Sequence, residues 1–212
     1  QVIPTLDRSG AEKQMVLLAA GLPRDRFQVE VAALTRLGPL EADLRAAGIP
    51  VHAIGKRGKL DPMALGRLTR LIKAGRFDVV QTWIFAAHVY GRIAAKRAGV
   101  PVVVTAEMAA DLWKGRIHVW IDRRLAQQTD RLVGNSQAVV DFYRNVAGLP
   151  EDRLAMIPSG IADEEPPAVD PASVKAELDI PADAPMLLFA GRLYPQKGVI
   201  DLLKAADILQ NV

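Results

Sequence analysis

Two basic residues and two glycines stand close together in the run Pro185–Gly198, which reads PMLLFAGRLYPQKG. Met186–Ala190 is a short apolar segment typical of a buried parallel strand, and a helical pattern begins at Val199. Arg192 and Lys197 therefore fall where a strand ends and a helix begins, which is where open α/β sheets bind anionic ligands. The glycines let the backbone approach a ligand closely. We interpret this run as a diphosphate-binding turn.

A second glycine-containing loop lies near the start of the chain. Ser9 and Gly10 separate a predicted strand, Val2–Thr5, from a predicted helix, Ala11–Gly21. Free backbone N–H groups and the positive end of the helix dipole make such a loop a site for an anion. The same residues also suit a plain helix start, in which Ser9 and Glu12 form a capping box. Composition and spacing leave both interpretations of Gly10 open.

One carboxylate stands where a polar ligand could reach it. Glu107 follows the apolar run Val102–Ala106, a predicted strand, and so falls at the carboxyl edge of the predicted sheet. An ionised carboxylate there can accept hydrogen bonds from ligand hydroxyls. The alternative is an exposed glutamate that begins a loop.

The sequence gives little support for a hydrolase nucleophile, a metal site or a dinucleotide-binding site. Gly134–Ala138 imitates the nucleophile elbow of α/β-hydrolases, but all three histidines precede Ser136, so we interpret Ser136 as a helix N-cap. A hydrolase stays a distant alternative, because a histidine could follow Val212. The chain has no D-x-D or H-x-x-x-H spacing, so we expect no metal site. It has no G-x-G-x-x-G either, which argues against a dinucleotide oxidoreductase.

Apolar strand-like runs alternate with helical patterns along most of the chain. This alternation predicts an α/β fold with a doubly wound, mainly parallel, Rossmann-like sheet. The predicted strands are Val2–Thr5, Gln28–Ala33, Val51–Ile54, Asp78–Thr82, Val102–Ala106, Arg131–Gly134 and Leu154–Ile157. The predicted helices are Ala11–Gly21, Leu40–Ala47, Pro62–Ala74, Ala86–Ala98, Gly115–Gln127 and Gln137–Val146.

Composition and charge limit the cellular compartment and the kinds of partner that we expect for this protein. The 212 residues contain no cysteine, which suits a reducing cytoplasm, and the net charge of +3 is too small to indicate nucleic acid. No run is long enough to cross a bilayer. The stretches Lys56–Arg76 and Trp113–Arg124 are basic, and the second also carries two tryptophans. Each is either a solvated helix face or a surface that adsorbs to anionic lipid, on the inner side of a cell membrane.

A domain boundary is predicted in the acidic, proline-rich stretch Ala162–Pro171. It separates a first domain, residues 1–165, from residues 166–212, which contain a linker and then one strand, one turn and one helix. Both ends of the chain look cut, so we expect it to be part of a longer protein.

Four segments resemble motifs of the family 4 (group 1) retaining glycosyltransferases, which have the glycosyltransferase-B fold. Arg192–Gly198 with the preceding glycine is similar to the G-R-L-x-P-x-K-G segment, and Pro4–Gln14 to the first loop, G-G-A-E-R. Pro158–Ala162 is similar to P-N-G-I-D, and Asn135–Ser136 to the N-S turn. The resemblance implies that residues 1–165 form the acceptor-side domain, and that 166–212 begin an incomplete donor-binding domain.

The resemblance also implies roles for single residues. Arg192 and Lys197 would hold the diphosphate of a nucleotide-diphosphate sugar, and Gly10 would contact the donor. Glu107 would stand where the family has a histidine near the reacting sugar. The nucleotide sugar would be a substrate, no cofactor would be needed, and the acceptor would be a glycan or a lipid-linked glycan.

In the family, the departing phosphate helps to deprotonate the acceptor, so no protein base is needed. The family's E-x7-E pair would follow Val212, so we expect this chain to be inactive alone. A sugar-nucleotide epimerase of related fold and a non-catalytic sugar-binding or lipid-binding module remain the alternatives.

Overall fold

The computed structural model describes residues 1–110, 113–161 and 169–210. The chain divides into two compact units, Gln1–Ala162 and Asp163–Val212. This division lies close to the predicted boundary, and the assignment of 1–165 and 166–212 as domains stays a prediction.

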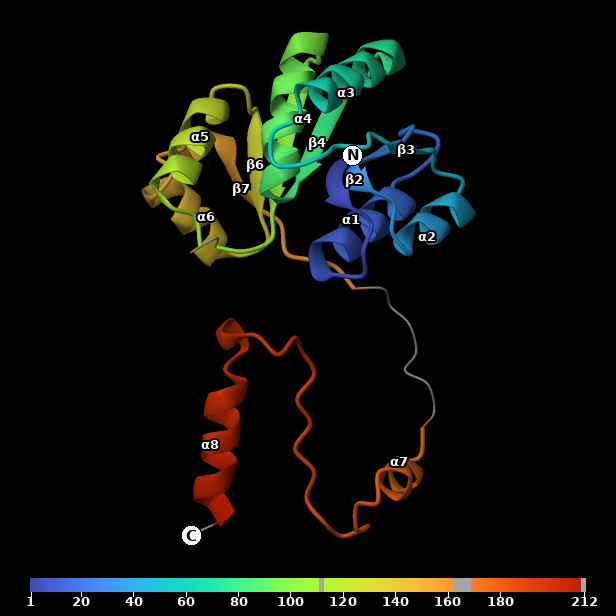
Figure 1. Cartoon of the computed structure of the whole chain (residues 1–212), viewed down its shortest axis with the longest axis vertical. Coiled ribbons are helices and arrows are strands. Elements are labelled where there is room, and N and C mark those ends of the chain that lie inside the picture. Colours follow the sequence, from blue (N-terminus) through green and yellow to red (C-terminus); the bar gives the residue numbers. More distant parts are fainter. Residues whose placement is uncertain (111–112, 162–168, 211–212) are drawn as a thin grey trace. The chain divides into compact units, whose positions relative to one another are not determined.

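The first unit is built on a parallel sheet, shown in Figure 1. In the described part of the chain the sheet has seven strands, in the order β3-β2-β1-β4-β5-β6-β7, and neighbouring strands pair in parallel. The strands are β1 Val2–Thr5, β2 Val31–Arg36, β3 Val51–Ala53, β4 Val79–Trp83, β5 Val102–Glu107, β6 Arg131–Gly134 and β7 Leu154–Met156. The chain adds β2 and β3 on one side of β1 and then β4–β7 on the other. This confirms the predicted doubly wound, Rossmann-like fold.

Helices cover both faces of this sheet. They are α1 Gly10–Gly21, α2 Leu40–Ala46, α3 Pro62–Gly75, α4 Ile84–Ala98, α5 Arg116–Ala126 and α6 Gln137–Asn145, with a short turn η1 at Glu151–Arg153. One core joins Ile3 of β1 to α1 and α2, and another joins Val2 of β1 to α3 and α4. Since successive side chains of a strand point to opposite faces, the two cores lie on opposite faces of the sheet. Because crossovers between parallel strands are right-handed, helices that connect strands on one side of β1 cover one face of the sheet, and helices that connect strands on the other side cover the opposite face.

The structure shifts one strand and corrects one cap. β2 is shifted from the predicted Gln28–Ala33 to Val31–Arg36. It continues past Ala33 because Val31 and Ala33 pack into one core while Ala32 and Leu34 pack into the other. At α1, the Ser9 hydroxyl donates to a carboxylate oxygen of Glu12 and caps no backbone N–H, so the predicted capping box is wrong.

The second unit is described from residue 169 to residue 210. It contains α7 Pro171–Glu177, a short turn η2 at Pro195–Lys197, and α8 Val199–Gln210. The predicted strand at Met186–Ala190 is wrong: these residues are not in a strand, and Leu187 and Leu188 are largely exposed. A strand needs a neighbour to accept its backbone hydrogen bonds, and the described residues of this unit supply none.

Candidate functional site

Three segments that the sequence singled out meet at one cavity in the first unit. The cavity has a volume of about 610 Å³, within the range of ligand sites. Its walls come from α1, from β4, β5 and β6, and from residues 157–161. Gln14 Nε2 donates to the Gly160 carbonyl at 2.6 Å, which joins α1 to the segment after β7. Asn135 Nδ2 donates to the Met108 carbonyl at 3.1 Å, which joins the loops after β6 and β5. Loops that are far apart in sequence therefore converge at the carboxyl edge of the sheet.

Gly10 is the first residue of α1, at the same edge. A side chain at Gly10 would meet no atom within 4 Å, so the backbone is open to a ligand on that side. Nearby, Glu12 is buried, and Thr5 Oγ1 donates to Glu12 Oε1 at 3.5 Å. The sequence reasoning missed Glu12 as a candidate, because a glutamate in the first turn of a helix is favourable without any ligand. The donor contact of Gly10 stays a prediction.

Glu107 does not line this cavity. It is the last residue of β5, where Ala106 and Met108 point into the cavity and Glu107 points to the opposite face. Its side chain is only 5% exposed and lies 3.2 Å from His88 Nε2 and 3.8 Å from Lys114 Nζ. The interpretation of Glu107 as an exposed loop residue is therefore wrong. No observation tests its predicted contact with a sugar.

The charge of Glu107 is stabilised by its neighbours. Burial raises the pKa of this carboxyl, but the charge and contact of His88, the charge of Lys114 and a hydrogen bond from Tyr143 together lower the pKa to about 2. His88 Nε2 is buried and makes no well-aligned hydrogen bond, so its contact with Glu107 is mainly electrostatic. On the other side of the ring, His88 Nδ1 lies 2.8 Å from the Thr82 hydroxyl.

The ionic contacts of Glu107 continue into a buried network. Lys114 Nζ donates to Asp122 Oδ2 at 2.8 Å and to the Tyr143 hydroxyl at 2.6 Å. Arg92 Nη2 donates to Asp122 Oδ1 at 2.7 Å. Two carboxylates thus face two cations, which is how proteins tolerate buried charge. The members come from α4, β5, the β5–α5 connection, α5 and α6, and nothing in their sequence spacing predicted that they would meet.

Arg192 and Lys197 lie in the second unit, in the turn before α8. Both side chains are exposed. Gly198 takes a left-handed conformation, with φ of 66°, and α8 begins at the next residue. The Tyr194 N–H donates to the Arg192 carbonyl at 2.8 Å, and the Lys197 N–H to the Tyr194 carbonyl at 2.8 Å. The predicted turn before a helix is present, and its binding of a diphosphate stays a prediction.

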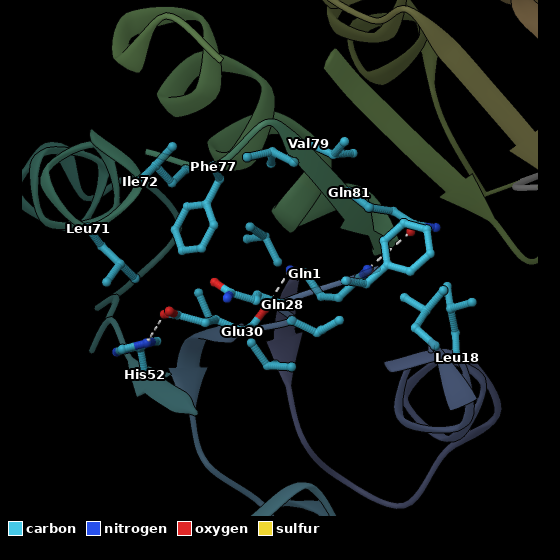
Figure 2. A pocket seen from close by; sticks show the side chains of 17 residues that line it. Gln1, Leu18, Gln28, Glu30, His52, Leu71, Ile72, Phe77, Val79 and Gln81 are labelled. Carbon is cyan, nitrogen blue, oxygen red and sulfur yellow. Dashed lines mark hydrogen bonds and ion pairs between the residues drawn. The ribbon is translucent and has the colours of Figure 1, made fainter. Parts of the chain in front are cut away.

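A second cavity, of about 250 Å³, lies at the other edge of the sheet and is shown in Figure 2. Its labelled residues include Leu71, Ile72, Phe77 and Val79, and it lies beside the first residues of β1, β2 and β4. An ion pair between Glu30 and His52, at 2.7 Å, closes part of its wall. Because doubly wound sheets bind ligands at their carboxyl ends, this cavity is not the candidate site.

The described residues show no clustered metal ligands and no helix suited to a bilayer. No group of three or more metal-ligating side chains gathers within the ranges 1–110, 113–161 and 169–210. Over the same ranges, no helix has both the length and the apolar content needed to cross a membrane.

Comparisons with known proteins bear on both units. A family model described as Glycosyltransferase Family 4 matches residues 8–165. The chain is 28% identical over 183 residues to D-inositol 3-phosphate glycosyltransferase of Acidothermus cellulolyticus, covering 80% of this chain and 39% of that protein. It is 26% identical over 224 residues to UDP-Gal:alpha-D-GlcNAc-diphosphoundecaprenol alpha-1,3-galactosyltransferase of Escherichia coli, covering 100% of this chain and 57% of that protein. The chain thus spans about half the length of these relatives.

Solved structures share the fold. Anabaena Alr3699/HepE, crystallised with UDP, aligns with a TM-score of 0.68 and 20% identity over 84% of this chain and 49% of that one. A glycosyltransferase from Rickettsia africae aligns with a TM-score of 0.76 and 17% identity, over 99% of this chain and 57% of that one.

Proposed function

The chain belongs to Glycosyltransferase Family 4, and from this we propose that its protein transfers a sugar from a nucleotide-diphosphate sugar to an acceptor, with retention of anomeric configuration. One observation carries the proposal. Helix α1 and the residues that follow β5, β6 and β7 converge on a cavity of ligand size at the carboxyl edge of a doubly wound sheet. The names of the relatives support it, since the Escherichia coli relative uses UDP-Gal and the Anabaena structure holds UDP.

For the donor, we propose that Arg192 and Lys197 bind the diphosphate. Negative charge grows on the departing diphosphate during transfer, and two cations in a turn before a helix stabilise that charge. Gly10 would bring the backbone of the first loop close to the donor. Transfer would then need no protein base, because a phosphate oxygen of the leaving group accepts the acceptor's proton.

For the acceptor, we propose a glycan or a lipid-linked glycan held by the first unit. A lipid-linked acceptor agrees with the name of the Escherichia coli relative. Exposed apolar residues of α5, at Ile117 and Trp120, accompany exposed Arg116. Such a surface suits attachment to an anionic membrane.

For Glu107, we propose that it acts through its ion pairs rather than through the sugar. It faces away from the cavity, and its partner Lys114 belongs to the connection that follows β5 at the ligand-binding edge. We therefore treat Glu107 as a positioning residue for that connection.

The test is a screen of nucleotide sugars against glycan and lipid-linked acceptors, performed on the whole protein. We expect acceptor-dependent release of nucleoside diphosphate and a product with the donor's anomeric configuration, determined by NMR. Conversion of the sugar nucleotide without an acceptor would instead identify an epimerase. Binding of nucleotide without turnover in any mixture would identify a non-catalytic module.

A further inference from the structure

An exposed aromatic cluster lies at the carboxyl edge, outside the cavity. Trp113 precedes α5, and its ring meets Phe85 of α4 with centroids 5.8 Å apart and His118 of α5 with centroids 5.1 Å apart. Phe85 and His118 also meet, at 5.1 Å, so the three rings contact one another edge to face. Despite these contacts, Trp113 is 60% exposed.

The cluster rests on the buried ionic network. Lys114, the next residue, is buried, and its ammonium lies 5.1 Å from the ring centre of Phe85 and 4.9 Å from that of Tyr143. The same ammonium is bound to Asp122. The backbone at Trp113 is therefore held by its buried neighbour Lys114, and the ring of Trp113 packs against two others. A surface aromatic that is already held in place loses little conformational entropy when a ligand binds.

Resting on the proposed glycosyltransferase function, we propose that Trp113 is a stacking platform for a pyranose ring of the acceptor. A pyranose presents one face of C–H groups bordered by hydroxyls, and an exposed indole ring held by its neighbours offers a matching flat apolar surface. The position fits an acceptor, because Trp113 lies between β5 and α5 and its partner Phe85 lies at the start of α4 directly after β4, so both stand at the carboxyl edge where such sheets bind ligands.

A second tryptophan provides a matched control. Trp120 is 65% exposed and lies one helical turn from Ile117, which is 73% exposed, on α5. No aromatic ring among the described residues packs on Trp120. An unbraced tryptophan beside an exposed isoleucine suits insertion into lipid headgroups better than stacking on a sugar. The two tryptophans should therefore affect different measurements.

The kinetic test compares Trp113→Ala, Trp113→Phe and Trp120→Ala in the whole protein, with an acceptor found by the screen. We expect Trp113→Ala to raise the acceptor KM about fivefold to tenfold, with donor KM and kcat little changed, since a stacked ring contributes on the order of one decade of affinity. Trp113→Phe should recover most of the loss, and Trp120→Ala should leave unchanged the KM for a water-soluble glycan acceptor measured without vesicles. An unchanged acceptor KM in Trp113→Ala would overturn the proposal. If that variant instead binds anionic vesicles less well than wild type, Trp113 contacts lipid.

A binding test on the 212-residue chain needs no activity. Methyl pyranosides are titrated against the intrinsic fluorescence, with the open-chain polyol mannitol as the control ligand. We expect a pyranoside-dependent change that persists in Trp120→Phe and disappears in Trp113→Phe. An equal response to mannitol, or a response that survives Trp113→Phe, contradicts the stacking role. If the wild-type protein transfers no sugar at all, the proposed function fails, and this titration still decides whether Trp113 binds a sugar ring.

Discussion

At the scale of the residue, Glu107 shows how the face of a strand decides a role. Its neighbours Ala106 and Met108 line the cavity, whereas Glu107 lies among His88, Lys114 and Tyr143 on the other face of β5. A carboxylate in that place organises other charges and is shielded from solvent. Removing one member of such a network leaves its partners buried and uncompensated.

We predict that Glu107→Ala destabilises the protein by about 3–5 kcal/mol, because it leaves the buried cations Arg92 and Lys114 to share the carboxylate of Asp122 and opens a cavity. Glu107→Gln should cost less, since the amide keeps the shape and Lys114 keeps Asp122. Denaturant unfolding measures both. The control is Glu151→Gln, which removes an ion pair with Arg144 from a glutamate whose side chain is 72% exposed, and should cost about 0–1 kcal/mol. Equal losses for Glu107→Ala and Glu151→Gln would contradict the structure.

The same carboxylate predicts a dependence on pH. Folding lowers the pKa of Glu107 from 4.5 to about 2, so its contribution to stability is complete above about pH 4.5 and is lost as the pH falls toward 2. The difference in unfolding free energy between wild type and Glu107→Gln should therefore shrink over that interval. A difference that stays constant from neutral pH to pH 2 would show that folding does not lower the pKa of Glu107.

Arg192 and Lys197 carry the prediction for the donor. In the whole protein, Arg192→Ala and Lys197→Ala should each weaken binding of a nucleoside diphosphate by about 1.5–3 kcal/mol, the value of a charge-assisted hydrogen bond. Calorimetric titration measures the loss, and Lys204→Ala, on α8 beyond the turn, serves as the control. Wild-type affinity in both variants would end the assignment.

At the scale of the element, the two basic stretches contain residues of two kinds: some bond to the protein's own backbone, and others are exposed. Arg67 of α3 donates to the carbonyls of Ile54 and Gly55, at 2.7 and 2.9 Å, so it stabilises the first unit. Arg123 of α5 likewise donates to the Val146 carbonyl at 2.8 Å. Arg116, Ile117 and Trp120 are exposed on the same helix and remain available to a membrane.

We predict that α5 contributes to binding of anionic vesicles. Arg116→Ala should weaken binding by about 1 kcal/mol, and added salt should weaken wild-type binding, because exposed charges are screened. Ile117→Ser should weaken binding through loss of apolar contact. Sedimentation with neutral and anionic liposomes measures each, with Met156→Ser on β7 as the control. Negligible binding of wild type to both kinds of vesicle would mean that these residues are an ordinary solvated face.

At the scale of the whole molecule, the two units differ in what supports them. The first has a complete hydrogen-bonded sheet with helices on both faces. In the described part of the second, the residues before the Arg192–Lys197 turn pair with no strand, and Ile200, Leu203, Ile208 and Leu209 of α8 are exposed.

We therefore predict that the 212-residue chain transfers no sugar alone, because its candidate donor turn lacks a supporting sheet. The measurement is a transfer assay with a panel of nucleotide sugars and acceptors, run beside the whole protein. Turnover comparable to that of the whole protein would refute this prediction.

The fold class could be predicted from local sequence patterns, since alternating apolar runs and helical patterns are local signals and right-handed crossovers restrict how they assemble. The sequence also located the loops that meet at the cavity, because the carboxyl ends of parallel strands share one edge. The three-dimensional structure was needed to show that Glu107 faces a buried ionic network and that Trp113 packs against Phe85 and His118. Those side chains come from separate elements, and their meeting depends on strand order, on the face each residue occupies and on packing, none of which leaves a mark in local spacing.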